Sequence, residues 1–376
     1  MEETPFVSII IPVRNAERTL DKTFEYLLNA KYPRDKMELV IADGGSTDKT
    51  LDVIRQWQQK YPFIKLVEVP NCPSPGYARN KALDVVKGEF ILFTDGDCAP
   101  CEEWITELLK PFYKDPKIGL VGGEIYTLKV DPNNLTEAYC EHSRFNMVAS
   151  RYANKGEGYF PPLSDRSPSQ ICGHRAYFFV TANVAYRREV IEKDHLRFWD
   201  KPTGEDIEFG LKAQRAGWKL YFAPKAYVKH MHRANFKALK KVWVTYGQAH
   251  PPLMQAYASQ VLEIVFRFIT GRGGLLRIKI PFPLKGLIYV GNFHLMHLFG
   301  LLTLLGLILS WGIWTLIFLG LFLIFLFSFS YYCFQMKPHR YFFSWWWMKY
   351  MTNLKFIQGG LKGFWKYKAF CIEPSF

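Results

Sequence analysis

The feature that most constrains this fold is a stretch of 51 residues, 286–336, that contains no Asp, Glu, Lys or Arg. One membrane-crossing helix needs about 20 apolar residues, so the stretch is long enough for two. Ser310, Trp311 and Gly312 divide it near its middle. We therefore expect a transmembrane hairpin with helices near 286–309 and 312–334. The alternative, a core hairpin of a soluble domain, is disfavoured because ordinary core helices are shorter.

The net charge of +14 is unevenly distributed along the chain. Residues 1–228 carry a net charge of −1, residues 229–285 of +9 and residues 337–376 of +6. Basic flanks on both sides of an apolar stretch follow the positive-inside rule and suit anionic lipid headgroups. We expect a multi-pass protein of the cell membrane with its N-terminal domain in the cytoplasm, and no nucleic-acid partner. The chain opens with Glu2 and Glu3, so we expect no signal peptide.

Seven cysteines, an odd number without a pairing pattern, fit a reducing compartment. Cys98 and Cys101 form a lone CxxC. A zinc site needs a second pair at suitable spacing, and a redox motif needs a thioredoxin-like context. The sequence offers neither, so we interpret these two as incidental thiols.

Short apolar runs alternate with helical patterns through the first hundred residues, beginning with the strand VSIIIPV and the helix that follows it. This alternation predicts an α/β fold with a doubly wound, mainly parallel sheet. In such sheets ligands bind beyond the carboxyl ends of the strands, and Pro12, Asp43, Pro70 and Asp95 lie at those ends. Residues 130–170 are rich in Tyr, Asn, Ser, Pro and Gly and read as a long irregular segment, either a lid on the acceptor side or a surface loop.

The run FILFTDGDC, which ends at Cys98, places two aspartates directly after an apolar strand. A strand buried on both faces has no structural use for paired carboxylates. Asp95 and Asp97 are two residues apart, and Gly96 allows a sharp turn between them. Two like charges held this close favour a cation, although Asp and Gly are also ordinary residues of a solvated turn.

Seven segments occur in an order that resembles glycosyltransferase family 2, the inverting nucleotide-diphospho-sugar transferases with a Rossmann-like GT-A fold. They are VSIIIPVRN, VIADGGSTDKT, PGYARNKAL, FTDGDC, TANVAYRREV, GEDIEFGLKAQRAGWKL and VKHMHR, and they span roughly residues 6–235. Each segment is weak alone, but their joint order is specific. The resemblance implies an enzyme that transfers a hexose from a nucleotide sugar.

The resemblance also implies where the donor and a metal ion bind. The residues implied to bind the nucleotide sugar are Pro12, Arg14, Asp43, Arg79 and Asp95. Asp43 corresponds to the carboxylate that reads the nucleobase, and Gly44 stands where a second Asp is more usual. The alternative for Arg79 is an arginine on the surface of its helix.

Asp95 and Asp97 match the DxD element, which binds Mg²⁺ or Mn²⁺ through oxygen ligands. His230 matches a position that often completes the shell of the metal or diphosphate. His232 is equally available by spacing.

The GED sequence at the start of a helix matches the catalytic base of the family. Asp206 takes that role, with Glu205 beside it shaping the acceptor site. The alternative is that two acids simply complement the helix dipole. Hydrolysis is disfavoured because no second base is spaced to activate water.

Processive synthases of this family carry a Gln-x-x-Arg-Trp signature, and the chain contains no Arg-Trp pair. Residues 240–250 look more like the basic segment of succinoglycan-type glucosyltransferases, so we expect single-sugar addition to a lipid-linked acceptor. The basic flanks, with the tryptophans of FFSWWWMKYM, suit a membrane interface, and we expect them to form basic interfacial helices. Two alternatives are a processive synthase and an inactive membrane scaffold.

The expected organisation is a GT-A catalytic domain over 1–235, a basic amphipathic segment over 236–285, the two transmembrane helices within 286–336, and a basic aromatic interfacial segment over 337–376.

Overall fold

The structure is a computed structural model that describes all residues except 1–3, 153–154, 174, 267–275, 337 and 375–376. The chain forms two compact units, and each is described by itself. The first comprises Met1–Ser164 and Ala176–Ala234, and the second comprises Asp165–Arg175 and Asn235–Phe376. Arg267, Arg272 and Lys337, three of the basic residues in the flanks of the apolar stretch, lie outside the described residues.

A sheet of nine strands organises the first unit, with the order β3-β2-β1-β4-β8-β6-β9-β5 and with β7 paired to β9. The strands β1 to β4 are parallel to one another, whereas β8 runs antiparallel to both β4 and β6. The sheet is therefore mixed, and its parallel part is formed by the first four strands of the chain. The strands are β1 (Val7–Val13), β2 (Met37–Asp43), β3 (Ile64–Glu68), β4 (Phe90–Thr94), β5 (Cys98–Pro100), β6 (Ile118–Thr127), β7 (Gly158–Tyr159), β8 (Asn183–Arg187) and β9 (Lys219–His230).

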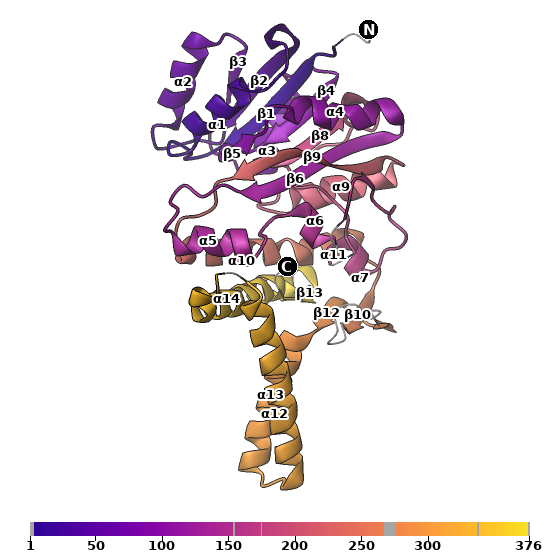
Figure 1. The fold of residues 1–376 in the computed structure, drawn as a ribbon. Coiled ribbons are helices and arrows are strands. Elements are labelled where there is room, and N and C mark those ends of the chain that lie inside the picture. Colours follow the sequence, from indigo (N-terminus) through magenta and orange to yellow (C-terminus); the bar gives the residue numbers. More distant parts are fainter. Residues whose placement is uncertain (1–3, 153–154, 174, 267–275, 337, 375–376) are drawn as a thin grey trace. The chain divides into compact units, whose positions relative to one another are not determined.

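Helices cover both faces of this sheet (Figure 1). Ile9 and Ile11 of β1 pack with α1, α2 and α4, while Ile10 packs with α3, α8 and α9 on the other side. Burial on both faces explains the unbroken apolar strand sequences. The helices are α1 (Leu20–Leu28), α2 (Thr50–Lys60), α3 (Pro75–Leu83), α4 (Trp104–Lys114), α5 (Leu135–His142), α6 (Val148–Arg151), α8 (Arg188–Glu192) and α9 (Glu205–Arg215), with the 3₁₀ turn η1 (Arg34–Lys36).

Helix α3 packs closely against its neighbours at Gly76, where there is no room for a side chain. A Cβ atom at Gly76 would lie 2.4 Å from the carbonyl oxygen of Trp199. At the next turn of the helix, Asn80 Nδ2 donates to the Phe198 carbonyl at 2.7 Å, and the Phe198 amide donates back to Asn80 Oδ1 at 2.9 Å. The start of α3 is thus held closely against the loop that precedes α9.

We expect Gly76→Ala to lower the free energy of unfolding by about 1–3 kcal/mol, because the added methyl group must displace backbone. For a unit of this size, that corresponds to a fall in Tm of roughly 2–4 °C per kcal/mol. Thermal unfolding of the purified chain measures the change. Gly156→Ala is the control, since a Cβ there meets nothing within 4 Å. Equal Tm values for the two variants would contradict the close contact.

The second unit contains a four-stranded sheet of order β11-β10-β12-β13 (Figure 1). Its strands are β10 (Val261–Phe266), β11 (Leu276–Pro281), β12 (Lys285–Val290) and β13 (Ala369–Ile372). Around it lie α7 (Pro168–Ile171), α10 (Phe236–Gln248), α11 (His250–Tyr257), α12 (Asn292–Ile308), α13 (Ile313–Phe334), η2 (His339–Tyr341), α14 (Phe342–Leu361) and α15 (Phe364–Tyr367). The basic segments beside the apolar stretch therefore contain strands as well as the expected helices.

The expected helix near 286–309 begins later than predicted. Residues 285–290 form β12, whose parallel partners are β10 and β13, so α12 starts at Asn292 and has 17 residues. Helix α13 has 22 residues, and within the described part of the chain it alone is long and apolar enough to cross a membrane. Between α12 and α13, Ser310 and Gly312 have positive φ.

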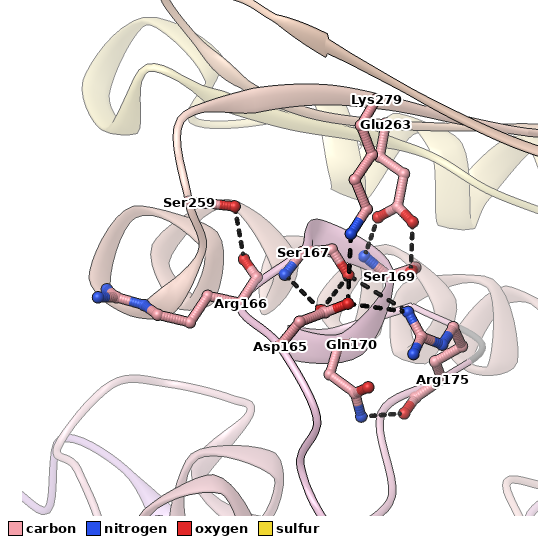
Figure 2. Close-up of polar contacts among 9 residues, drawn as sticks. All are labelled: Asp165, Arg166, Ser167, Ser169, Gln170, Arg175, Ser259, Glu263 and Lys279. Atoms are coloured by element: carbon pink, nitrogen blue, oxygen red, sulfur yellow. Dashed lines mark hydrogen bonds and ion pairs between the residues drawn. The ribbon is translucent and has the colours of Figure 1, made fainter.

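The segment 165–175, which interrupts the first unit in sequence, is anchored in the second unit (Figure 2). The carboxylate of Glu263 in β10 accepts hydrogen bonds from the backbone amide and the hydroxyl of Ser169, each at 2.7 Å. Asp165 pairs with Lys279 of β11 at 3.2 Å. Burial tends to raise the pKa of Asp165, but hydrogen bonds from Ser167 and the nearby Lys279 ammonium outweigh it and lower that pKa. Part of the segment that we expected to be irregular is therefore fixed by paired polar groups.

Candidate active site

The first two loops at the carboxyl edge of the sheet are bonded to each other. Asn15, at φ 55°, donates its backbone amide to Ser46 Oγ at 2.9 Å, and its side-chain oxygen accepts from the Thr47 amide at 2.8 Å. The Gly44 amide donates to the Val13 carbonyl at 2.8 Å. These bonds hold the ends of β1 and β2 together. Pro12 lies near the end of β1, and the exposed Arg14 is the first residue after this strand.

Asp43 is buried at the end of β2, where its carboxylate organises the glycine turn. Its Oδ2 accepts from the amides of Gly45 and Ser46, each at 3.0 Å, and its Oδ1 accepts from the Ser46 hydroxyl at 2.5 Å. The carboxylate of Asp43 therefore shapes the loop next to the position where the resemblance places the nucleobase.

Arg79 is a buried link between two carboxylates, with a side chain only 3% exposed. Its Nη1 lies 2.8 Å from Glu205 Oε1, and its Nη2 lies 3.1 Å from Asp95 Oδ1. The helix α3 thus joins the end of β4 to the start of α9. Arg79 is therefore not a helix-surface arginine. Its guanidinium is occupied by ion pairs with Asp95 and Glu205.

Asp97 and His230 form the second pair of the site. Strand β5 pairs antiparallel with β9 so that Cys98 stands opposite His230, and the Met231 amide donates to the Asp97 carbonyl at 2.8 Å. This register places His230 Nε2 3.3 Å from Asp97 Oδ1. Burial and, to a smaller extent, the neighbouring Asp95 raise the pKa of Asp97, while His230 opposes them.

The donor set around Asp97 fits a divalent cation. The contact of Asp97 Oδ1 with His230 Nε2 is an ion pair without hydrogen-bond geometry. Among the described residues, neither Asp97 Oδ1 nor His230 Nδ1 accepts or donates a hydrogen bond, although both atoms are buried. Ligand atoms of Asp97, Cys98 and His230 all lie within 4.8 Å of one another. Burial raises the pKa of the Cys98 thiol, as do Asp97 and Asp95, so this sulfur stays protonated and suits a hard cation poorly. The carboxylate and the imidazole are the suitable ligands.

Of the two histidines, His230 contacts Asp97, whereas His232 packs behind it. Their rings stack at 4.8 Å with an interplanar angle of 19°. His232 Nε2 lies 3.0 Å from the Thr127 hydroxyl. Burial and then the adjacent His230 lower the pKa of His232 well below its ordinary value. His232 is therefore a neutral support for His230.

Asp206 lies in the first turn of α9. Gly204 directly precedes this helix, and its φ of 83° allows the sharp turn into it. Burial, and then repulsion from Glu205, raise the pKa of Asp206 to about 7. A carboxylate with this pKa can accept a proton near neutral pH, which a general base must do. The ion pair of Glu205 with Arg79 holds the Glu205 carboxylate in its position next to Asp206.

Two further residues near Asp206 were missed from the sequence. The positive charge of Arg151, at the end of α6, opposes the rise in the pKa of Asp206, and its guanidinium lies 4.5 Å from the Phe178 ring centre. The hydroxyl of Tyr186 in β8 is buried, and Asp206 contributes, after burial, to its raised pKa. Tyr186 is part of the quoted segment TANVAYRREV, but Arg151 lies in the segment without a regular pattern, where the sequence gives no signal.

Comparison with known proteins agrees with the resemblance. The family model described as glycosyl transferase family 2 matches residues 8–194. The Methanococcus voltae enzyme named dolichyl N-acetyl-alpha-D-glucosaminyl phosphate 3-beta-D-2,3-diacetamido-2,3-dideoxy-beta-D-glucuronosyltransferase is 30% identical over 250 residues, 65% of this chain and 72% of that protein. Glycosyltransferase AglE of Haloferax volcanii is 26% identical over 63% of this chain and 70% of that protein.

Other similarities are more partial. The probable glycosyltransferase YdaM of Bacillus subtilis is 27% identical over 60% of this chain, which spans only half of that protein. The structure of a mannosyltransferase from Pyrobaculum calidifontis, solved with GDP-mannose and Mn²⁺, aligns with 68% of this chain and 64% of that chain at 20% identity and a TM-score of 0.47. That likeness is too weak to assign a ligand.

Asp206 and His230 lie beyond the residues that the family model matches, so their roles rest on the geometry above. The family itself rests on the match to residues 8–194 and on the 30% identity to a relative of which the chain covers more than two thirds. The chain belongs to glycosyl transferase family 2 and is an inverting enzyme of the hexosyltransferase type that transfers sugar from a nucleotide sugar.

Proposed function

We propose that this chain adds a single sugar from a nucleotide-diphosphate sugar to a lipid-linked acceptor, a polyprenyl phosphate or a lipid-linked saccharide, at the cytoplasmic face of the cell membrane. The observation that carries the proposal is the linked acidic site, in which Arg79 joins Asp95 to Glu205, and the adjacent Asp206 has a pKa of about 7. It supports a site in which a group able to take up a proton lies beside the carboxylates of the proposed donor site.

Asp206 is the proposed base. An acceptor oxygen attacks the anomeric carbon from the face opposite the diphosphate, the bond from that carbon to the diphosphate oxygen breaks, and the acceptor proton moves to Asp206. Attack from the opposite face inverts the configuration. The negative charge of Glu205 raises the pKa of Asp206. The ion pair with Arg79 holds the Glu205 side chain at the start of α9.

The proposed donor site is the carboxyl edge formed by β1, β2 and β4. Pro12, Arg14 and Asp43 line the part assigned to the nucleobase and ribose, and Asp95 lies towards the diphosphate. Asp97 and His230, with Asp95 nearby, would hold Mn²⁺ or Mg²⁺. When bound, such an ion supplies positive charge to the departing nucleoside diphosphate.

The proposed membrane anchor consists of α12 and α13, entering the membrane as a hairpin. The two helices pack along each other, with Asn292 Nδ2 donating to Ser328 Oγ at 2.6 Å. Outward-facing residues of both helices, such as Ile308 and Phe327, are exposed and apolar. Helix α12 is about 26 Å long, slightly shorter than a typical hydrocarbon core, and local thinning of the bilayer accommodates such a mismatch.

A lipid acceptor fits this anchor. The basic flanks of the hairpin attract anionic headgroups, and exposed aromatic side chains, among them Phe343, Trp347 and Trp365, suit the interface. The name of the Methanococcus voltae relative describes a dolichyl-phosphate-linked sugar as its acceptor. We infer an acceptor of the same chemical class, a saccharide or phosphate on a polyprenyl chain.

Transfer to lipid is tested with membranes that contain the chain, incubated separately with radiolabelled UDP-sugars and GDP-sugars. We expect radiolabel in the organic extract with only one of the donors, on a product that is one sugar longer than the acceptor. A ladder of products would show a processive synthase instead. Labelled product confined to the aqueous phase would contradict a lipid acceptor.

The pH profile tests the proposed base. Because Asp206 must be deprotonated to act and its pKa is about 7, kcat/KM should fall about tenfold per pH unit below that value. Glu205→Gln removes the neighbouring negative charge, so the acidic limb should move to lower pH. Glu192→Gln, at an exposed position, is the control. A limb that stays in place in Glu205→Gln would refute the assignment.

A further inference from the structure

A second cluster of potential metal ligands lies in the second unit. His250, Cys371 and Glu373 are each at most 3% exposed. One ligand atom of each residue, imidazole nitrogen, thiol sulfur and carboxylate oxygen, lies within 4.8 Å of the other two. None of the three residues takes part in the proposed sugar transfer, whose residues all belong to the first unit.

The fold brings these residues together from two distant parts of the chain. His250 is the first residue of α11, and its ring packs edge-on against Phe356 of α14 at 5.1 Å. Cys371 lies in β13, and Glu373 follows two residues later, so an extended backbone directs both side chains to the same side. Gly360 of α14 permits this arrangement, because a Cβ there would lie 2.2 Å from the Cys371 carbonyl oxygen.

The buried Cys371 thiol donates a hydrogen bond to Glu373 Oε2 at 3.9 Å, whereas a thiolate in its place would be repelled by that carboxylate. A divalent cation in this place would reverse the interaction, because it attracts both the thiolate and the carboxylate.

We propose that His250, Cys371 and Glu373 supply three of the ligands of a bound zinc ion. Sulfur, imidazole nitrogen and carboxylate oxygen are the ligands of protein zinc sites, at about 2.0–2.3 Å from the metal. Ligand atoms at those distances from a tetrahedral ion lie about 3.3–3.8 Å apart, so atoms that now lie within 4.8 Å of one another would move together by up to about 1 Å to close the site. The ion would tie the C-terminal strand β13 to the start of α11.

The experiment measures zinc in the full-length chain, purified in detergent and freed of loose metal by gel filtration. We expect about one zinc per chain in the wild type and less than about a fifth of that in Cys371→Ser and His250→Gln. Cys333→Ser, which removes another buried thiol of the second unit, should retain the zinc. Zinc that persists in Cys371→Ser but disappears in Asp97→Ala would overturn the proposal by assigning the ion to the catalytic site.

Cobalt provides a measurement that holds even if a variant folds poorly. The metal-free chain with Co²⁺ should show the near-ultraviolet absorption of a cobalt–thiolate bond, and zinc should abolish it. The band should persist in Cys98→Ser, which excludes the thiol beside Asp97. Absence of both zinc and the cobalt band from the wild-type chain would overturn the proposal. This result is independent of sugar transfer.

Discussion

Replacing Asp206 with Asn is expected to slow sugar transfer by about 10²–10⁴-fold, the usual contribution of a general base. Asparagine keeps the size and the position of the side chain but cannot accept a proton. Binding of the nucleotide should change by less than about twofold, because Asp206 is not assigned to the donor site. Initial rates at saturating donor, together with calorimetric titration of the nucleotide, separate these two effects.

The sign of the pKa shift predicts that Asp206→Asn keeps the fold. The folded state raises the pKa of Asp206 to about 7, so above that pH its charged form opposes folding, and Asn should leave Tm unchanged or higher. Asp200→Asn, in the exposed loop before α9, is the matched control and should retain full activity. Intact sugar transfer in Asp206→Asn would contradict the proposed base, and intact function in cells would favour an inactive scaffold.

The parallel half of the sheet was predictable because its signal is local. Strands β1, β2 and β4 are apolar at successive positions, and burial on both faces of a covered sheet requires that pattern. The positions of Asp43 and Asp95 follow from it, since each aspartate lies where a strand ends. Here the sequence pattern and the structure agree.

The start of the apolar hairpin was mispredicted for a physical reason. Residues 285–290 are almost entirely apolar and continue without a charge into α12, and periodicity alone does not distinguish a short buried strand from a helical turn. Their strand character comes from pairing with β10 and with β13, whose residues 369–372 lie about 80 positions later. Pairing at that separation leaves no local trace in the sequence.

The site contacts depend on similarly distant residues. Arg79 and Glu205 are 126 positions apart, so the sequence allowed a surface arginine where the structure has a buried ion pair. The choice between His230 and His232 depends on the register of β5 with β9, which sets Cys98 opposite His230. Because side chains alternate along a strand, a shift of this pairing by two residues would bring His232 opposite Cys98 instead.

Replacing Asp97 with Ala is expected to abolish the part of nucleotide binding that depends on a divalent cation, a loss of about 100-fold or more in affinity in the presence of Mn²⁺. The reason is the donor set: without Asp97, His230 loses the carboxylate at 3.3 Å and Asp95 remains fixed by Arg79. Titration with UDP and with GDP, each with and without Mn²⁺, measures the effect and identifies the nucleobase.

The same titration distinguishes a cation site from a merely structural pair. Asp97 is a buried acid with a raised pKa, so its removal should not lower Tm in the absence of metal, whereas Mn²⁺ plus nucleotide should stabilise the wild type and not the variant. Asp35→Ala, at an exposed turn, should behave as the wild type in both measurements. Tight nucleotide binding that ignores Mn²⁺ and survives in Asp97→Ala would mean that Asp97 and His230 support the end of β9 and that the diphosphate is neutralised by protein side chains alone.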